Sequence, residues 1–206
     1  MPTLLHIDSS PRAASVSSRL SAAFVERWKR RNPAGTVIHH NTTAERIPYL
    51  DEAAVAAWFV ASEDLTTEQR QTLAYSDKLV DELLAADVIV LGVPMWNLSV
   101  PASLKAWIDV IVREGRTFAF TEQGVAPLVP EGKRLYVLSA RGGSYPAGSP
   151  FAALDHLEPY LRAILGCIGL VDLEFIYADH QSEGPEAAGE GIAKAEEALA
   201  CLGLLA

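Results

Sequence analysis

Short apolar runs alternate with stretches of helical periodicity along this chain. The apolar runs lie at Thr3–Asp8, Thr36–His40, Val88–Val93, Arg134–Ser139 and Leu173–Ala178. Runs of this length that are rich in β-branched residues are typical of strands, and the run over 88–93 is apolar enough to be buried on both faces. The pattern predicts five strands of a parallel sheet with helices between them.

Between these runs, apolar residues recur at the three- and four-residue spacing of a helix. Two helix starts carry specific signals, because Thr66 to Gln69 matches a capping box and Pro101 stands at a favoured first-turn position. The predicted helices lie around Leu20–Trp28, Ala53–Val60, Thr66–Leu84, Pro101–Ile111, Ser149–Leu165 and Pro185–Leu202.

Parallel strands joined by helices through right-handed crossovers form a doubly wound sheet. We therefore expect an α/β, flavodoxin-like fold with a five-stranded parallel sheet in the order 2-1-3-4-5 and helices on both faces. The sequence has no internal repeat, low-complexity tract or linker. We expect one domain over residues 1–206.

The charge balance narrows the classes of partner. Lys and Arg number 17 against 26 Asp and Glu, and the net charge of −9 favours neither nucleic acid nor an anionic membrane as a partner. No apolar run approaches the roughly 18 residues of a membrane helix, and no basic leader precedes the first strand. These features lead us to expect a cytoplasmic protein.

The cysteines and histidines suggest no metal site. Cys167 and Cys201 lie in apolar runs and are predicted to be small buried residues, not disulfide partners or ligands. Neither CxxC nor HExxH occurs, and the 5 His residues are scattered, so we expect no metal. His6 lies inside the first strand and is interpreted as a core or edge residue, not as a proton donor.

The predicted topology places a ligand site beyond the carboxyl ends of the strands, where the strand order reverses. For the expected order this point lies between the first and third strands. The loops that follow Asp8, Val93 and Leu138 should therefore form the site. All three loops have an unusual composition.

The loop after Asp8 predicts an anion site. It continues as SSPRAASVSSRL, which places Ser9, Ser10, Ser15 and Ser17 between a strand end and a helix start. Free backbone N–H groups and the helix dipole attract anions there, and with neither a Walker loop nor GxGxxG present, a phosphomonoester fits. Alternatively, these serines are only caps and turn formers.

The loop after the third strand reads VPMWNLSVP and is unexpectedly apolar. Trp96 offers a flat surface to an aromatic ring system, and Asn97 offers a donor and an acceptor to the edge of such a ring. The alternative is a tryptophan packed over the end of the sheet, with the asparagine forming a turn.

The loop after the fourth strand reads LSARGGSYPAGSP. Gly142-Gly143 permits close approach of the backbone to a ligand, Arg141 could bring positive charge to a reduced ring, and Tyr145 could cover it. The alternative is a flexible glycine turn with a solvated arginine. Taken together, the three loops offer an anion site for a phosphate, an aromatic surface for a ring system and a glycine turn that lets the backbone approach a ligand. These features match the shape of FMN.

At these residues the sequence resembles the FMN-dependent NADH:azoreductase family, within the flavodoxin-like NAD(P)H quinone reductases. The similarity runs through Ser9-Ser10, PMWN at 94–97, LKAWID at 104–109, GRTFAFTEQG at 115–124 and SARGG at 139–143. PMWN followed by RGG is the most specific part of this pattern.

The resemblance implies a homodimer with one FMN per subunit. Electrons would pass from NADH or NADPH to quinones, and azo compounds would be reductively cleaved, by a ping-pong hydride mechanism. The chemistry then lies on the flavin, and no catalytic acid or base is expected. The cofactor-binding residues implied by position are Ser9, Ser10, Ser15, Val16, Ser17, Met95, Trp96, Asn97, Leu98, Ser139, Ala140, Arg141, Gly142 and Gly143.

Three aromatic residues are expected in the substrate pocket. Phe59 and Phe120 would come from the neighbouring chain, and Tyr145 from the loop beside the flavin. Two positions depart from the family pattern, since Trp96 stands where tyrosine is frequent and Ala140 stands where a second hydroxyl is frequent. These departures bear on substrate range more than on the identity of the cofactor.

Three other classes share the architecture. An FAD-dependent quinone reductase would need a segment that cradles the adenosine, and none is evident. A flavodoxin-type electron carrier has no substrate pocket, and the excursion over Asn41–Asp64 and the aromatic segment Phe118–Phe120 favour an enzyme instead. A non-enzymatic regulator on the same fold stays open, because fold alone does not determine function.

Overall fold

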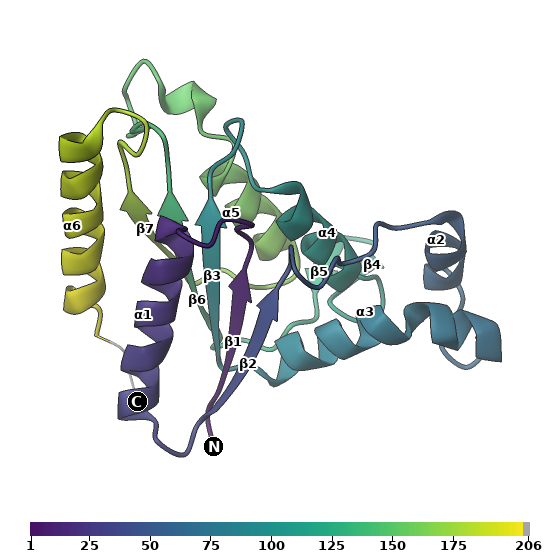
Figure 1. The fold of residues 1–206 in the computed structure, drawn as a ribbon. Coiled ribbons are helices and arrows are strands. Elements are labelled where there is room, and N and C mark those ends of the chain that lie inside the picture. Colours follow the sequence, from purple (N-terminus) through teal and green to yellow (C-terminus); the bar gives the residue numbers. More distant parts are fainter. Residues whose placement is uncertain (204–206) are drawn as a thin grey trace.

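The computed structural model describes residues 1–203 as a three-layer α/β fold around one parallel sheet (Figure 1). The strand order is β2-β1-β3-β6-β7, which is the doubly wound order predicted from the sequence. The strands span β1 (Thr3–Asp8), β2 (Thr36–Asn41), β3 (Val88–Pro94), β6 (Arg134–Ala140) and β7 (Leu173–Ala178).

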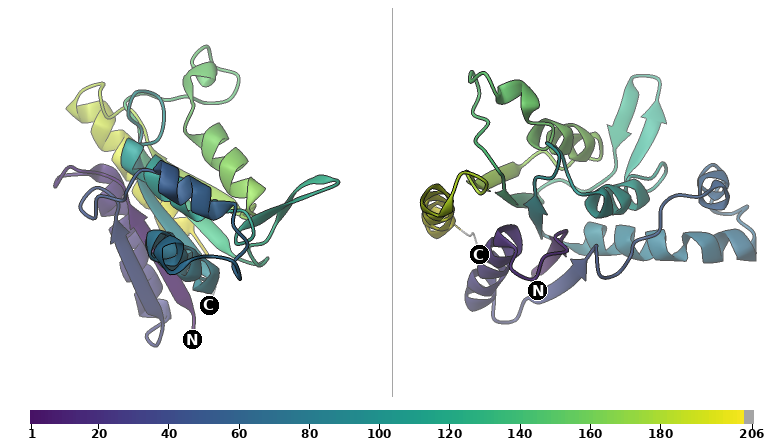
Figure 2. Two further views of the ribbon diagram at one scale, coloured as in Figure 1. Left: turned by 90° about the vertical axis from the view of Figure 1, so that its right-hand side faces the viewer. Right: turned by 45° about the horizontal axis from the view of Figure 1, so that its top comes forward.

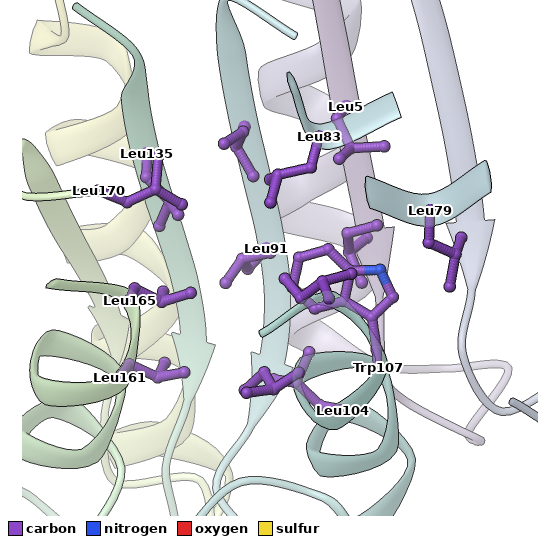
Figure 3. Packing of buried hydrophobic residues seen from close by; sticks show 14 of the residues in the cluster. Leu5, Leu79, Leu83, Leu91, Leu104, Trp107, Leu135, Leu161, Leu165 and Leu170 are labelled. Atoms are coloured by element: carbon purple, nitrogen blue, oxygen red, sulfur yellow. The ribbon is translucent and has the colours of Figure 1, made fainter. Parts of the chain in front are cut away.

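Helices cover both faces of the sheet, as Figures 1 and 2 show. One face carries α1 (Val16–Arg31) and α6 (Pro185–Cys201), and the other carries α3 (Thr67–Ala85), α4 (Ala102–Ile111) and α5 (Glu158–Cys167). Each face has its own apolar core. The larger one joins leucines of α3, α4 and α5 to Trp107 against the strands (Figure 3).

The central strand β3 lies in contact with α1 at a glycine. A Cβ on Gly92 would lie 2.6 Å from Ser21 Oγ and 3.3 Å from the carbonyl oxygen of Ser17, so a larger residue has no room there. All residues of β3 after Val88 are buried, as the continuous apolar run predicted. This close packing brings the N-terminus of α1 to the carboxyl end of β3.

Two of the predicted helices, α2 (Glu52–Trp58) and α3, are present, whereas the helix predicted to begin at Ser149 begins later in the chain. Thr66 and Gln69 form the predicted capping box at the start of α3, and α2 overlaps the short helix expected over Ala53–Val60. The helix predicted from Ser149 is wrong, because the chain forms only a 3-10 turn, η1 (Ala152–Leu154), before α5. Asp155 interrupts it, since its carboxylate accepts hydrogen bonds from the N–H groups of Leu157 (2.9 Å) and Glu158 (3.0 Å).

A second, smaller sheet was not predicted. The strands β4 (Phe118–Thr121) and β5 (Gly124–Pro127) form an antiparallel hairpin that projects from the body of the molecule (Figure 2). Its strands are only four residues each and alternate too briefly to stand out in the sequence. The hairpin carries Phe118 and Phe120, whose rings meet edge to face at 5.3 Å.

The prediction that both cysteines are buried is wrong, because Cys167 and Cys201 are free and exposed. In α5 the buried positions are Leu161 and Leu165, and a residue two places further on lies on the opposite side of the helix. In α6 the buried Leu199 leaves Cys201 outside for the same reason.

None of the helices over residues 1–203 is both long and apolar enough to cross a membrane.

Candidate functional site

A pocket of about 320 Å³ lies at the carboxyl ends of the parallel strands, where the strand order reverses. Its size falls within the roughly 300–1,000 Å³ of small-ligand sites. The three predicted loops meet here, together with the loop between β7 and α6. The pocket is lined by Ser10, Arg12, Ala14, Ser15, Val16, Pro94, Met95, Trp96, Ala140, Arg141, Gly142, Gln181 and Ser182.

The N-terminus of α1 forms one end of the pocket. Ser15 caps the helix, and its Oγ accepts a hydrogen bond from the N–H of Ser18 at 3.2 Å. Within residues 1–203, the N–H groups of Val16 and Ser17 have no acceptor. Two backbone donors at the positive end of a 16-residue helix are thus available to an anion.

Two of the predicted phosphate residues, Ser9 and Ser17, are completely buried and do not line the pocket. The N–H and the hydroxyl of Ser9 both donate to the carbonyl of Gly92, at 3.1 and 2.9 Å. Ser9 therefore joins the ends of β1 and β3. The hydroxyl of Ser17 lies 3.1 Å from that of Ser15 and supports the capping residue.

The loop between β3 and α4 is a tight turn that presents Trp96. The N–H of Trp96 donates to the carbonyl of Ser99 at 3.0 Å, and the reverse hydrogen bond measures 3.1 Å. Between them, Asn97 and Leu98 have φ values of 49° and 70°, a left-handed backbone that is costly for leucine. Trp96 lines the pocket, whereas Asn97 lines an adjoining hollow beside Tyr160.

Arg141 is held rigidly in the wall of the pocket. Its guanidinium donates to both carboxylate oxygens of Asp179, at 2.6 and 2.9 Å, and to Asp155 at 3.1 Å. It also lies 3.5 Å from the centre of the Tyr177 ring. Its charge is therefore balanced by two carboxylates, and Arg141 does not supply the free positive charge expected from the sequence.

Tyr177 stays neutral beside this cluster. Burial raises the pKa of its phenol, and the hydrogen bond that it donates to Glu158 raises the pKa further. Tyr177 therefore offers an uncharged ring to the guanidinium of Arg141, which is a favourable cation–π arrangement.

The contribution of the loop between β7 and α6 was not predicted. Gln181 and Ser182 line the pocket, and their N–H groups donate to the carbonyls of Arg141 (3.0 Å) and Gly142 (3.1 Å). The signal that could have found them is the predicted strand at Leu173–Ala178, whose carboxyl end must reach the same edge of the sheet. Arg12, Ala14 and Pro94 also line the pocket and were overlooked, although they belong to the predicted loops.

The remaining predicted residues lie at varying distances from the pocket. Ala140 and Gly142 line it. Ser139 is buried and does not line it, and the Ser139 hydroxyl has no hydrogen-bond partner within residues 1–203. The ring of Tyr145 lies 5.5 Å from the guanidinium of Arg141. The structure does not bring Phe59 or Phe120 to this pocket. Gly143 and Leu98 are near neighbours of lining residues but do not line it themselves.

The pocket can bind a flat ligand that carries an anionic end. Of the described residues that line it, only Arg12 and Arg141 are charged, and no carboxylate faces it. The free amides of α1 suit the anion, the indole of Trp96 suits a ring, and Gly142 lets the backbone approach closely.

The chain is similar to known proteins over nearly its whole length. A family model described as a flavodoxin-like fold matches residues 2–201. The chain is 45% identical over 201 residues to a protein of Nostoc sp. named FMN-dependent NADH:quinone oxidoreductase, covering 97% of each chain. It is 42% identical over 200 residues to a protein of Pseudomonas aeruginosa named FMN-dependent NADH:quinone oxidoreductase 3, covering 97% of this chain and 92% of the relative.

Solved structures of similar fold include two azoreductases. A crystal structure of an azoreductase from Bacillus anthracis superposes with a TM-score of 0.87 at 32% identity and covers 97% of this chain and 98% of the other. A second structure from that organism, an FMN-dependent NADH-azoreductase in complex with FMN, gives a TM-score of 0.83 at 25% identity, with the same coverage of both chains.

Proposed function

We infer the function from one premise: the chain belongs to the flavodoxin-like fold family, among relatives named FMN-dependent NADH:quinone oxidoreductase. It is an FMN-dependent oxidoreductase that passes electrons from NADH to quinones, and its similarity to azoreductases adds azo compounds as acceptors. The observation that carries this conclusion is that eight of the cofactor-binding residues implied by the resemblance line one pocket at the point where the strand order reverses.

The residues of this pocket fit FMN. Among residues 1–203, the N–H groups of Val16 and Ser17 have no acceptor and so suit the phosphate. The hydroxyl of Ser10 accepts a hydrogen bond there only from the N–H of Arg12 (3.3 Å) and can donate to the phosphate. The indole of Trp96 suits the ring system, and the described lining contains no carboxylate that would repel a phosphate. Ser9, Ser17 and Ser139 would then support the contacting residues from behind.

The role of this chain is to bind and orient the reactants. When bound, FMN supplies two-electron chemistry that no side chain of the protein offers. The ion pairs of Arg141 with Asp155 and Asp179 hold the loops after β6 and β7 in place. The two hydrogen bonds between Trp96 and Ser99 fix the turn that presents Trp96 to the pocket. We propose that the nicotinamide, NADH or NADPH, and the acceptor use the same open side of the pocket in turn, in a ping-pong cycle.

We also propose that the enzyme is a homodimer whose substrate pocket is completed by the partner subunit. Phe59 and Phe120 support this proposal, because they are 74% and 64% exposed and lie away from the pocket of their own subunit. A partner that covers them would remove two large apolar side chains from water. Tyr145, beside Arg141, would line the same pocket from within the subunit.

We further propose that the protein works in the cytoplasm. Two free, exposed thiols, Cys167 and Cys201, are compatible with a reducing compartment, where cysteines persist without pairing.

Spectroscopy and kinetics of the purified protein test the function. We expect a yellow protein that releases FMN, and not FAD, on denaturation, and that oxidises NADH only when a quinone or azo dye is present. Mass measurement of the released cofactor identifies it. A colourless protein that does not take up FMN would refute the proposal, and an FMN protein without NADH-dependent turnover would indicate an electron carrier.

A further inference from the structure

We propose that Arg12 supplies the positive charge of the phosphate-binding site. Its guanidinium binds the phosphate of FMN and makes the site select FMN over riboflavin. This inference rests on the proposed function, because it concerns the same pocket. It assigns a role to a side chain that neither the sequence pattern nor the resemblance singled out.

The charges that line the pocket leave one arginine without a carboxylate partner within residues 1–203. Arg12 and Arg141 are the pocket's two charged lining residues, and Arg141 is neutralised by Asp155 and Asp179. Within residues 1–203, no carboxylate lies within 4.0 Å of the Arg12 guanidinium, and no hydrogen-bond acceptor for it is present. The positive charge of Arg12 is therefore available to a ligand.

Hydrogen bonds of the loop between β1 and α1 fix the position of the Arg12 main chain. Its N–H donates to Ser10 Oγ at 3.3 Å, and the N–H of Ser10 in turn donates to Asp8 Oδ1 at 3.2 Å. These hydrogen bonds hold the main chain of Arg12 beside Ser10, on the pocket side of the loop that leads into α1. Asp8 does not compete for the guanidinium, because it is mostly buried and its Oδ1 also accepts from the hydroxyl of Ser18 at 2.8 Å.

A bound phosphate carries more negative charge than the N-terminus of α1 can balance. A phosphomonoester carries about −1.5 to −2 charges at neutral pH, whereas the N-terminus of a helix supplies only about half a positive charge. The protein as a whole carries a net charge of −9, which repels the ligand at long range. A guanidinium beside the free amides of Val16 and Ser17 offsets this deficit and can donate two hydrogen bonds.

Titrations of FMN and riboflavin into the apoprotein test this role. Riboflavin shares the ring system and the ribityl chain but lacks the phosphate. We expect Arg12→Gln to weaken FMN binding about fivefold to thirtyfold, and riboflavin binding less than twofold. We also expect the affinity of the variant for FMN to depend less on salt than that of the wild type, and Arg12→Lys to restore part of the loss.

Arg19→Gln is the matched control. Arg19 lies on the outer side of α1, pairs with Glu196 at 3.6 Å and does not line the pocket, so its removal changes the net charge equally without touching the site. We expect this control to change FMN affinity less than twofold. The melting temperatures of the apoproteins should be unchanged by either substitution, because both side chains are exposed.

Other results of these titrations would contradict the role of Arg12, and each result points to a different explanation. Equal losses of FMN and riboflavin affinity would mean that Arg12 shapes the pocket without binding phosphate. An unchanged FMN affinity with a raised KM for NADH would assign Arg12 to the nicotinamide instead. If the wild-type protein bound neither flavin, the proposed function itself would fail, whereas wild-type FMN binding that Arg12→Gln leaves intact would remove only this inference.

Discussion

Arg141 and Asp179 form a two-point ion pair that ties the end of β6 to the end of β7. The two N–O distances are 2.6 and 2.9 Å, and the arginine side chain is 5% exposed. Backbone hydrogen bonds from Gln181 and Ser182 to the carbonyls of Arg141 and Gly142 reinforce the connection. Two of the four loops that line the pocket are therefore fixed to each other by contacts within the protein.

Loss of this ion pair should destabilise the fold and loosen the cofactor site. We expect Asp179→Ala to lower the free energy of unfolding by about 2–4 kcal/mol, because among the described residues 1–203 it leaves the buried guanidinium with one carboxylate partner, Asp155, in place of two. Urea denaturation measures this change. Asp172→Ala, which removes an exposed partner of Arg134 at 3.6 Å, is the control and should cost less than about 1 kcal/mol. Equal effects of the two substitutions would contradict the structural role of Asp179.

Asn97 should contribute in two separable ways, through its backbone and through its amide. Its φ of 49° favours asparagine or glycine, so Asn97→Ala should lower the free energy of unfolding by about 1 kcal/mol and Asn97→Gly should not. If the amide binds the flavin edge, both variants should weaken FMN binding by about 1–3 kcal/mol. Titration of FMN into each apoprotein checks this, and wild-type affinity in Asn97→Gly would rule out the amide contact.

Buried His6 should make stability depend on pH. Its Nε2 lies 2.9 Å from Ser21 Oγ and its ring lies 4.7 Å from that of His39; burial, and then the nearby His39, lowers the pKa of His6 from 6.5 to about 4. Between pH 6.5 and about pH 4, the unfolded chain therefore binds a proton at His6 that the folded chain does not bind. The stability that the neutral ring provides is complete above pH 6.5 and is lost as the pH falls towards 4.

Urea denaturation of the wild type and of His6→Gln isolates this contribution. Between pH 7 and pH 5, we expect the wild type to lose about 2 kcal/mol more than the variant, which has no titrating group at this position. The carboxylates that also titrate in this range are common to both proteins and cancel. Parallel pH profiles for the two proteins would contradict the lowered pKa.

The dimer should depend on the exposed aromatic residue of the β4–β5 hairpin. We expect light scattering to give twice the chain mass for the wild type, and Phe120→Asp to weaken the dimer and reduce quinone reduction, because a charge would be buried in the interface. Val171→Asp is the control, since Val171 is 77% exposed and lies outside the hairpin. A wild-type monomer with full activity would refute the dimer.

The sequence was sufficient to predict the sheet, because local chemistry determines it. The continuous apolar run of β3 specifies a central strand, the spacing of Leu20, Phe24 and Trp28 specifies the buried side of α1, and crossover handedness leaves few strand orders. The same rules predicted a pocket at the carboxyl edge, where the structure has one, and eight of the lining residues belong to the predicted set, namely Ser10, Ser15, Val16, Met95, Trp96, Ala140, Arg141 and Gly142.

Only the tertiary structure decided which partner each polar group has. Arg141 looks free in the sequence, but Asp155 and Asp179, 14 and 38 residues away, neutralise it. Ser9 resembles a phosphate ligand, yet its two donors bind Gly92, 83 residues away. Such pairings depend on contacts between distant segments, which periodicity does not encode. For the same reason the sequence does not distinguish Arg12 from Arg141, although within residues 1–203 only Arg141 of these two has carboxylate partners.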